Sequence, residues 1–324
     1  MTTDGRTDID VFEAASIDHA DDNGIRSMMS RDERALYFDV ARRYGGRGEV
    51  VELGTWLGSG TFEICRGLAA VGHPWHLTAL DRFAWTQEQA TKFPLPGLAA
   101  GDSFLPVFLG NLAPFRDRLT AVAGEIDDLP ALMPLPGPVE ILYVDAPKSW
   151  KLLWRVVDHI GPRLLPGATV VFQDFFHITS RQLIWLAMSI PELRLTAMTR
   201  TGTTAVFEAS GPVADLAGRV PYDVRALGAA GYVRLWERVR AELPASRLGE
   251  VAVGMALDLL GRQAVAEAER VLTEGARGSA RIEAVIAQVD RLAAKGNPDA
   301  DVLGRIARFL RDGTTVDAAR RRRA

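Results

Sequence analysis

The most restrictive feature of this sequence is a glycine-rich stretch that follows a short apolar run. Residues 50–61 read V-V-E-L-G-T-W-L-G-S-G-T, which predicts a buried strand, a tight turn and the start of a helix. Glycines at 54, 58 and 60 allow a positive φ and a close approach of backbone to a ligand. A dinucleotide-binding turn needs the order G-x-G-x-x-G, which these glycines do not follow. The spacing therefore disfavours NAD and favours another nucleotide-type ligand.

The rest of the chain predicts alternating strands and helices that end in a hairpin. An N-cap residue with early acids, followed by apolar positions, predicts a helix from Ser30 that leads into the first strand. Residues 139–146 and 168–175 are near-continuous apolar runs, as expected for parallel strands covered on both faces, with a turn at 166–167 between them. Residues 193–199 and 203–209 flank a tight turn and predict an antiparallel hairpin. The long segment 82–105 predicts a substrate-side loop.

The glycine stretch resembles motif I of the class I S-adenosylmethionine-dependent methyltransferases, and the order of elements over residues 30–209 is similar to theirs. The resemblance implies an α/β fold: a Rossmann-like, doubly wound, seven-stranded sheet with an antiparallel terminal hairpin. We expect a flexible N-terminal arm at 1–25, the methyltransferase domain at 26–212 and an α-helical region at 213–324. The C-terminal helices are expected to serve oligomerisation, a lid or a partner contact, or simple packing.

In that family the motif I carboxylate lies near the amino acid part of the cofactor, and the glycines pass under its ribose. An acid that ends the second strand binds the ribose hydroxyls, and the turn after the third strand flanks the adenine. The resemblance therefore implies S-adenosylmethionine as cofactor. The expected binding residues are Glu52, Gly54, Gly58, Ser59, Gly60, Thr61, Asp81, Arg82, Gly124, Glu125, Ile126 and Asp145.

The ends of the fourth and fifth predicted strands carry the candidate chemistry. The sequence Y-V-D-A-P-K is similar to the V-D-A-x-K pattern of caffeoyl-CoA O-methyltransferases and to the D-x-x-K of catechol O-methyltransferase, which implies a metal ligand at Asp145 and a base at Lys148. The next strand ends F-Q-D-F-F-H, so Asp174 matches a second metal carboxylate, and Gln173 is a third candidate ligand for Mg²⁺.

This second strand end departs from the families it resembles. Phe175 stands where the catechol-type enzymes place an Asn ligand, and Gln173 replaces the first Asp of the macrocin-type sugar O-methyltransferases, which the lead-in sequence resembles most. The metal therefore stays open, because Asp145 and Asp174 also suit strand ends and helix caps. His177 is a second candidate base, since its unperturbed pKa of about 6.5 suits proton abstraction near neutrality.

Composition narrows the remaining classes. A net charge of −3 with interspersed signs gives no affinity for nucleic acid, and no apolar run is long enough to span a membrane. The single cysteine, Cys65, cannot form an internal disulfide and fits a cytoplasmic location. We expect methyl transfer to a hydroxyl of a small molecule such as a sugar or polyketide. The sequence leaves open whether Mg²⁺ assists the reaction and whether the protein forms a homo-oligomer. One alternative is a catalytically inactive binding or scaffold protein that acts through its C-terminal helices, and another is metal-independent N- or C-methylation on the same fold.

Overall fold

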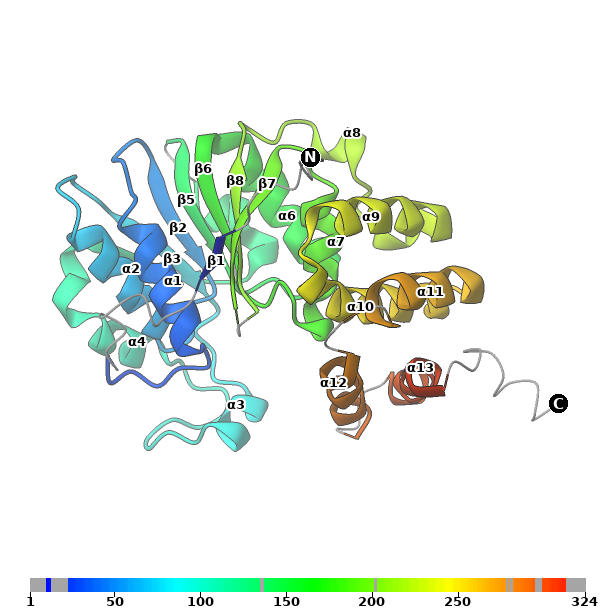
Figure 1. Ribbon diagram of the computed structural model, residues 1–324. Helices are drawn as coiled ribbons and strands as arrows, with labels where there is room; N and C mark the ends of the chain where they lie inside the picture. Colours follow the sequence, from blue (N-terminus) through cyan, green and yellow to red (C-terminus); the bar gives the residue numbers. More distant parts are fainter. Residues whose placement is uncertain are drawn as a thin grey trace. The chain divides into compact units, whose positions relative to one another are not determined.

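The computed structural model (Figure 1) describes residues 10–12, 23–134, 137–200, 203–277, 279, 282–294 and 299–312. They form two compact units. A sheet unit spans Ile9–Phe175 and Ile190–Val220, and a helical unit contains Phe176–Ser189 and the described residues from Pro221 onward. The domain limits expected at residues 25 and 212 stay predictions; within the predicted arm, residues 10–12 form a strand.

One mixed sheet forms the centre of the sheet unit. Its strands are β1 (Asp10–Phe12), β2 (Glu49–Leu53), β3 (Leu77–Asp81), β4 (Leu119–Ala123), β5 (Val139–Val144), β6 (Leu164–Phe172), β7 (Leu193–Thr199) and β8 (Ala205–Ala209). The strand order is β1-β7-β8-β6-β5-β2-β3-β4. Strand β8 runs antiparallel to both β6 and β7, and the other pairs are parallel. The expected seven-stranded doubly wound sheet is confirmed, with the short β1 added at its edge.

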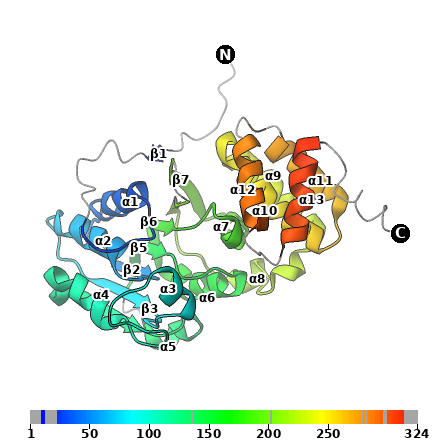
Figure 2. The same cartoon turned by 90° about the horizontal axis from the view of Figure 1, so that it is seen from below.

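The central strands are apolar because the sheet is covered on both faces. All six residues of β5 are buried, which agrees with the continuous apolar pattern of a parallel strand between two helical layers. Figure 2 shows α1 and α2 on one face of the sheet and α5 and α6 on the other. The strand order reverses between β2 and β5, where the carboxyl ends of parallel strands leave a crevice for a ligand.

The helices of the sheet unit are α1 (Arg31–Ala41), α2 (Ser59–Ala69), α3 (Gln87–Lys92), α4 (Leu105–Asn111), α5 (Leu129–Leu132), α6 (Trp150–Ile160) and α8 (Leu216–Arg219). Helix α1 begins with a capping box, in which the Ser30 hydroxyl accepts from Glu33 N and the Glu33 carboxylate accepts from Ser30 N. This motif satisfies two amide groups that the first turn would otherwise leave unpaired. The predicted helix start at Ser30 is confirmed.

Three local expectations need correction. The predicted turn at Pro166-Gly167 lies inside β6, where the register with β5 shifts; Gly167 has φ +78°, so the chain bulges and then continues the strand. The same strand ends at Phe172 and not at Phe175, so the predicted ligands Gln173 and Asp174 belong to the following turn. The segment after β3 contains α3, which begins with a Thr86–Gln89 capping box.

The helical unit consists of α7 (Gln182–Met188), α9 (Gly228–Glu242), α10 (Ala245–Gly261), α11 (Val265–Val271), α12 (Ile282–Ala294) and α13 (Ala300–Asp312). Helices α12 and α13 lie side by side (Figures 1 and 2). Inside the unit, the Asp258 carboxylate accepts from Arg181 Nε at 2.9 Å and from Trp185 Nε1 at 2.8 Å. Among the described helices, none is both long and apolar enough to cross a membrane.

Candidate active site

Two adjoining cavities lie at the carboxyl ends of the central strands. The larger has a volume of about 460 Å³ and is lined by Met28, Gly54, Trp56, Leu80, Asp81, Arg82, Gln89, Gly124, Glu125, Ile126, Asp145, Ala146, Lys148, Ser149 and Leu152. The smaller, of about 190 Å³, is lined by Ser27, Met28, Met29, Tyr37, Glu52, Gly54, Thr55, Trp56, Ser59, Gly60, Asp145, Lys148, Gln173 and Asp174. Because Met28, Gly54, Trp56, Asp145 and Lys148 line both, the two cavities form one continuous site.

The glycine turn between β2 and α2 is fixed by close packing. Gly54 has φ +91°, and a Cβ there would come within 2.6 Å of Ala146 N. Gly58 also has φ +91°, and a Cβ there would meet a Leu112 methyl group at 2.5 Å. Both contacts are shorter than a side chain tolerates, and both φ values favour glycine. These two glycines are therefore needed for the turn itself, whatever binds next to it.

Asp81 ends β3 and holds the glycine turn in place. Its Oδ2 accepts hydrogen bonds from the backbone N–H groups of Thr55 at 2.8 Å and Trp56 at 3.0 Å, and its Oδ1 accepts from Phe83 N at 3.1 Å. Trp56 has φ +45°, a conformation that a non-glycine residue keeps only when its surroundings hold it. Each carboxylate oxygen has two lone pairs, so Oδ1 keeps capacity for one further donor from the larger cavity.

Glu52 is a buried carboxylate that faces the smaller cavity. Its side chain is 2% exposed, and Oε2 makes no hydrogen bond within the described part of the chain. Burial raises the pKa of Glu52 to about 8; the Thr61 hydroxyl lowers it in part, and the carboxylates of Asp145 and Asp81 raise it further. An unpaired, buried acceptor of this kind fits a cationic or hydrogen-bond-donating ligand group.

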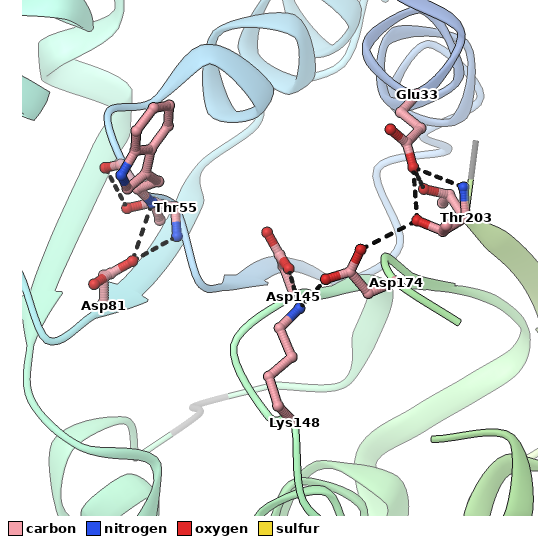
Figure 3. Close-up of polar contacts among 9 residues, drawn as sticks. Glu33, Thr55, Asp81, Asp145, Lys148, Asp174 and Thr203 are labelled. Atoms are coloured by element: carbon pink, nitrogen blue, oxygen red, sulfur yellow. Dashed lines mark hydrogen bonds and ion pairs between the residues drawn. The ribbon is translucent and has the colours of Figure 1, made fainter. Parts of the chain in front are cut away.

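Lys148 lies between the carboxylates of Asp145 and Asp174 (Figure 3). Its Nζ donates to Asp145 Oδ1 and to Asp174 Oδ2, both at 2.7 Å. Burial lowers the pKa of Lys148, but the two carboxylates more than offset this and hold it above its ordinary value. Burial also raises the pKa of Asp145, an effect that Lys148 opposes and Asp174 reinforces. Lys148 could act as a base near neutral pH only if its pKa were lowered. Because its pKa is raised, its side chain carries an ammonium group instead.

The same residues can be tested as a magnesium site. Gln173 is 7% exposed and its Oε1 has no hydrogen-bond partner among the described residues. Two carboxylates and an unpaired amide oxygen agree with the oxygen ligands that Mg²⁺ prefers. A divalent ion at Asp145 and Asp174 would replace Lys148 Nζ in its contact with them. No group of three or more His, Cys, Asp or Glu side chains suited to a metal occurs within the ranges that the structure describes.

Phe175 cannot supply the ligand that catechol-type enzymes carry at this position. Its side chain is fully buried and its ring packs 5.3 Å from that of Phe207 and 6.1 Å from that of Phe172. Asp174, one residue earlier, has φ +59°, a left-handed conformation that costs about 1–3 kcal/mol outside glycine. The turn therefore presents Asp174 to the site and places Phe175 in the core.

The structure brings most of the expected site residues together. Of the expected cofactor residues, Gly58 and Thr61 line neither cavity, and they act in the turn and in helix α2. His177 belongs to the helical unit, is half-buried and lines neither cavity. Of the two candidate bases, Lys148 therefore lines the site and His177 does not, while the expected metal ligand Asp145 lines both cavities.

Several lining residues were not expected from the sequence, and two of them, Trp56 and Met28, line both cavities. Trp56 lies in the quoted glycine stretch, yet nothing in its spacing predicts that it lines both cavities; its ring stacks on Trp85 at 6.2 Å and meets the edge of Phe93 at 5.4 Å. Met28 comes from the segment before α1 and is 54% exposed. Their side chains give the junction of the cavities an apolar wall.

The sheet order, the glycine turn and the acids at the ends of β2, β3 and β5 define a class I methyltransferase fold. Residues 51–175 match a family model described as "Methyltransferase domain". The chain therefore contains a methyltransferase domain, and the expectation of a methyltransferase is confirmed. No curated protein matches the chain.

Solved structures give further similarities. Cofactor-bound Rv0187 from MTB is 19% identical with a TM-score of 0.41, and the match covers 61% of this chain and 89% of that one. The O-methyltransferase TomG from Streptomyces achromogenes, solved with SAM, is 17% identical with a TM-score of 0.42, covering 56% and 82%. CalS11, a TDP-rhamnose 3'-O-methyltransferase, is 16% identical with a TM-score of 0.39, covering 53% and 77%.

Proposed function

We propose that this protein transfers a methyl group from S-adenosylmethionine to a hydroxyl group of a small molecule. The observation that carries the proposal is the continuous site at the carboxyl ends of the strands. At one end lie Asp81 and the Gly124–Ile126 turn, suited to a nucleoside. At the other end lie Asp145, Lys148 and Asp174, which can move a proton. A nucleoside end joined to a proton-transfer end is what methyl transfer to a hydroxyl requires.

The residues of the nucleoside end fit this cofactor. Asp81 Oδ1 retains a lone pair for a ribose hydroxyl, and the unpaired Glu52 Oε2 suits the ammonium of an amino acid moiety. S-Adenosylmethionine, when bound, supplies a methyl group on a positively charged sulfur. The combined cavity volumes fall within the range of small-molecule sites.

Asp145 and Lys148 have different roles at the proton-transfer end of the site. Asp145 Oδ2 makes no hydrogen bond within the described residues, while Oδ1 accepts from Lys148. We assign Oδ2 as the atom that takes the proton of the acceptor hydroxyl, because the raised pKa of Asp145 makes it a stronger base than an ordinary aspartate. The Lys148 ammonium stabilises the negative charge that develops on the acceptor oxygen. Mg²⁺ held by Asp145, Asp174 and Gln173 would supply a stronger positive charge at that place.

Calorimetric titration with S-adenosylmethionine and S-adenosylhomocysteine, each with Mg²⁺ and with EDTA, tests the proposal. Micromolar binding supports it and justifies a screen of hydroxylated sugars and polyketides as acceptors. Asp128→Asn serves as the matched control for Asp81→Asn. Asp128 is an exposed acid that follows the Gly124–Ile126 turn and lines neither cavity. Absence of binding under every condition would refute the cofactor assignment and favour the scaffold alternative.

The cellular setting and the assembly state belong to the same proposal. We infer a cytoplasmic enzyme, from the single buried Cys65 and the charge pattern, and a homo-oligomer assembled through the helical region. Fractionation of cells and light scattering of the purified protein test the two statements separately.

A further inference from the structure

We infer that Thr203, fixed by the buried carboxylate of Glu33, is a positioning residue that holds Asp174 against Lys148. The inference rests on the proposed function, since it assigns a role in methyl transfer. Neither Glu33 nor Thr203 lies within residues 51–175, which match the methyltransferase model. Both belong to the sheet unit together with Asp174 and Lys148.

Glu33 is the fixed end of this arrangement. Its side chain is 4% exposed, and Oε2 accepts from Ser30 N and Ser30 Oγ at 2.9 Å in the capping box. Its Oε1 accepts from Thr203 N at 3.0 Å and from the Thr204 hydroxyl at 2.9 Å. The bonds join the start of α1 to the start of β8, which are 170 residues apart in sequence.

The Thr203 hydroxyl lies between two carboxylates (Figure 3). Its Oγ1 is 3.2 Å from Glu33 Oε1 and 3.1 Å from Asp174 Oδ1. A hydroxyl carries one hydrogen, and Glu33 Oε1 already accepts two hydrogen bonds, which fill its two lone pairs. The Thr203 hydrogen is therefore directed to Asp174 Oδ1. Glu33 fixes Thr203 through its backbone N–H, and Thr203 passes that constraint to Asp174.

Asp174 needs such a partner because of its backbone. Its φ of +59° is unfavourable for a residue with a Cβ, so neighbouring contacts must hold the turn. Thr203 binds Oδ1 while Lys148 binds Oδ2, so the two partners fix the plane of the carboxylate from opposite sides. Loss of the Thr203 hydroxyl removes the hydrogen-bond donor to Oδ1, so the carboxylate is held less firmly in the plane that faces Lys148.

The test compares Thr203→Val, which removes the hydroxyl at nearly constant volume, with Thr203→Ser, which keeps it. Thr196→Val is the control, because Thr196 Oγ1 donates to Val206 O in the same hairpin and lines neither cavity. For each protein, crystal structures give the position of Asp174, calorimetry gives the S-adenosylhomocysteine affinity, and kinetics on an acceptor from the screen give kcat and KM.

We expect Thr203→Val to turn the Asp174 carboxylate away from Lys148 and to lower kcat by about ten- to a hundredfold, as for loss of a hydrogen bond to a charged group. KM for the acceptor and the S-adenosylhomocysteine affinity should stay within about threefold, Thr203→Ser should restore kcat, and Thr196→Val should match the wild type. An unmoved Asp174 in Thr203→Val, or equal defects in the Val and Ser variants, overturns the inference. Failure of the wild type to bind S-adenosylhomocysteine overturns the proposed function. In that case the crystal structures of the variants still test whether Thr203 positions Asp174.

Discussion

Glu52 gives the sharpest quantitative prediction, because its buried carboxyl binds a proton in the folded protein at a pH where the unfolded chain has lost it. The pKa of Glu52 is raised by burial to about 8, from an ordinary value of 4.5. Below pH 4.5 the group is protonated in both states, so its contribution to stability is fully present. As pH rises from 4.5 to 8, only the unfolded state releases the proton, and the free energy of unfolding falls by about 1.4 kcal/mol per pH unit.

The full separation of about 3.5 pH units corresponds to about 5 kcal/mol, lost once the pH exceeds 8. Glu52→Gln removes the titration while keeping the shape of the side chain. We expect urea unfolding between pH 5 and 9 to show Glu52→Gln gaining stability over the wild type as pH rises, by several kcal/mol at pH 8. Glu208→Gln, an exposed glutamate on β8, is the control and should parallel the wild type.

Parallel curves for Glu52→Gln and the wild type would refute the reasoning, because they would mean that Glu52 titrates alike in both states. The same carboxyl links proton release to ligand binding. A cation bound next to Oε2 lowers the pKa of Glu52, so cofactor binding should release a proton near neutral pH. Calorimetry in buffers of different ionisation enthalpy measures this release directly, and Glu52→Gln should abolish it.

Three further outcomes follow from the contacts. Asp81→Asn should weaken S-adenosylhomocysteine binding in calorimetry by about tenfold or more, because the amide NH₂ cannot accept from the Thr55 and Trp56 N–H groups; unchanged affinity would contradict the assignment. Lys148→Met should raise the affinity for Mg²⁺, since Nζ no longer pairs with both carboxylates, and calorimetry that shows no increase would argue against a metal at this place. Glu33→Ala should lower the free energy of unfolding by about 2–4 kcal/mol, because it removes the capping-box bond and leaves the Thr203 backbone N–H and the Thr204 hydroxyl without their acceptor, as urea unfolding will show.

The sequence predicts the sheet well because its strands carry a local signal. The apolar residues of β5 and the acids at Glu52 and Asp81 mark both the strands and the edge where their side chains meet. The bulge at Gly167 was missed because a Pro-Gly pair has the same local pattern in a turn and within a bulged strand. Its place inside β6 depends on pairing with β5, which no local pattern encodes.

The charge states of the site residues could not be predicted from local sequence patterns either. Motif spacing places Lys148 beside Asp145, but the second carboxylate that raises the pKa of Lys148 belongs to Asp174, which arrives from another strand end. Glu33 carries the local signature of a capping box, and this says nothing about its bonds to Thr203 and Thr204. Contacts between distant segments thus decide which group holds a proton and which group is fixed.

The Lys148 contacts also bear on the choice between an ammonium and a metal ion. Either cation between Asp145 and Asp174 lowers the pKa of a neighbouring hydroxyl, but they place different demands on Gln173. An ammonium donates to the two carboxylates and leaves Gln173 Oε1 without a partner, as it is among the residues that the structure describes, whereas Mg²⁺ would take that oxygen as a ligand. Gln173→Leu therefore separates the two cases: methyl transfer through Lys148 should survive this substitution, and methyl transfer through Mg²⁺ should fall together with the Mg²⁺ affinity.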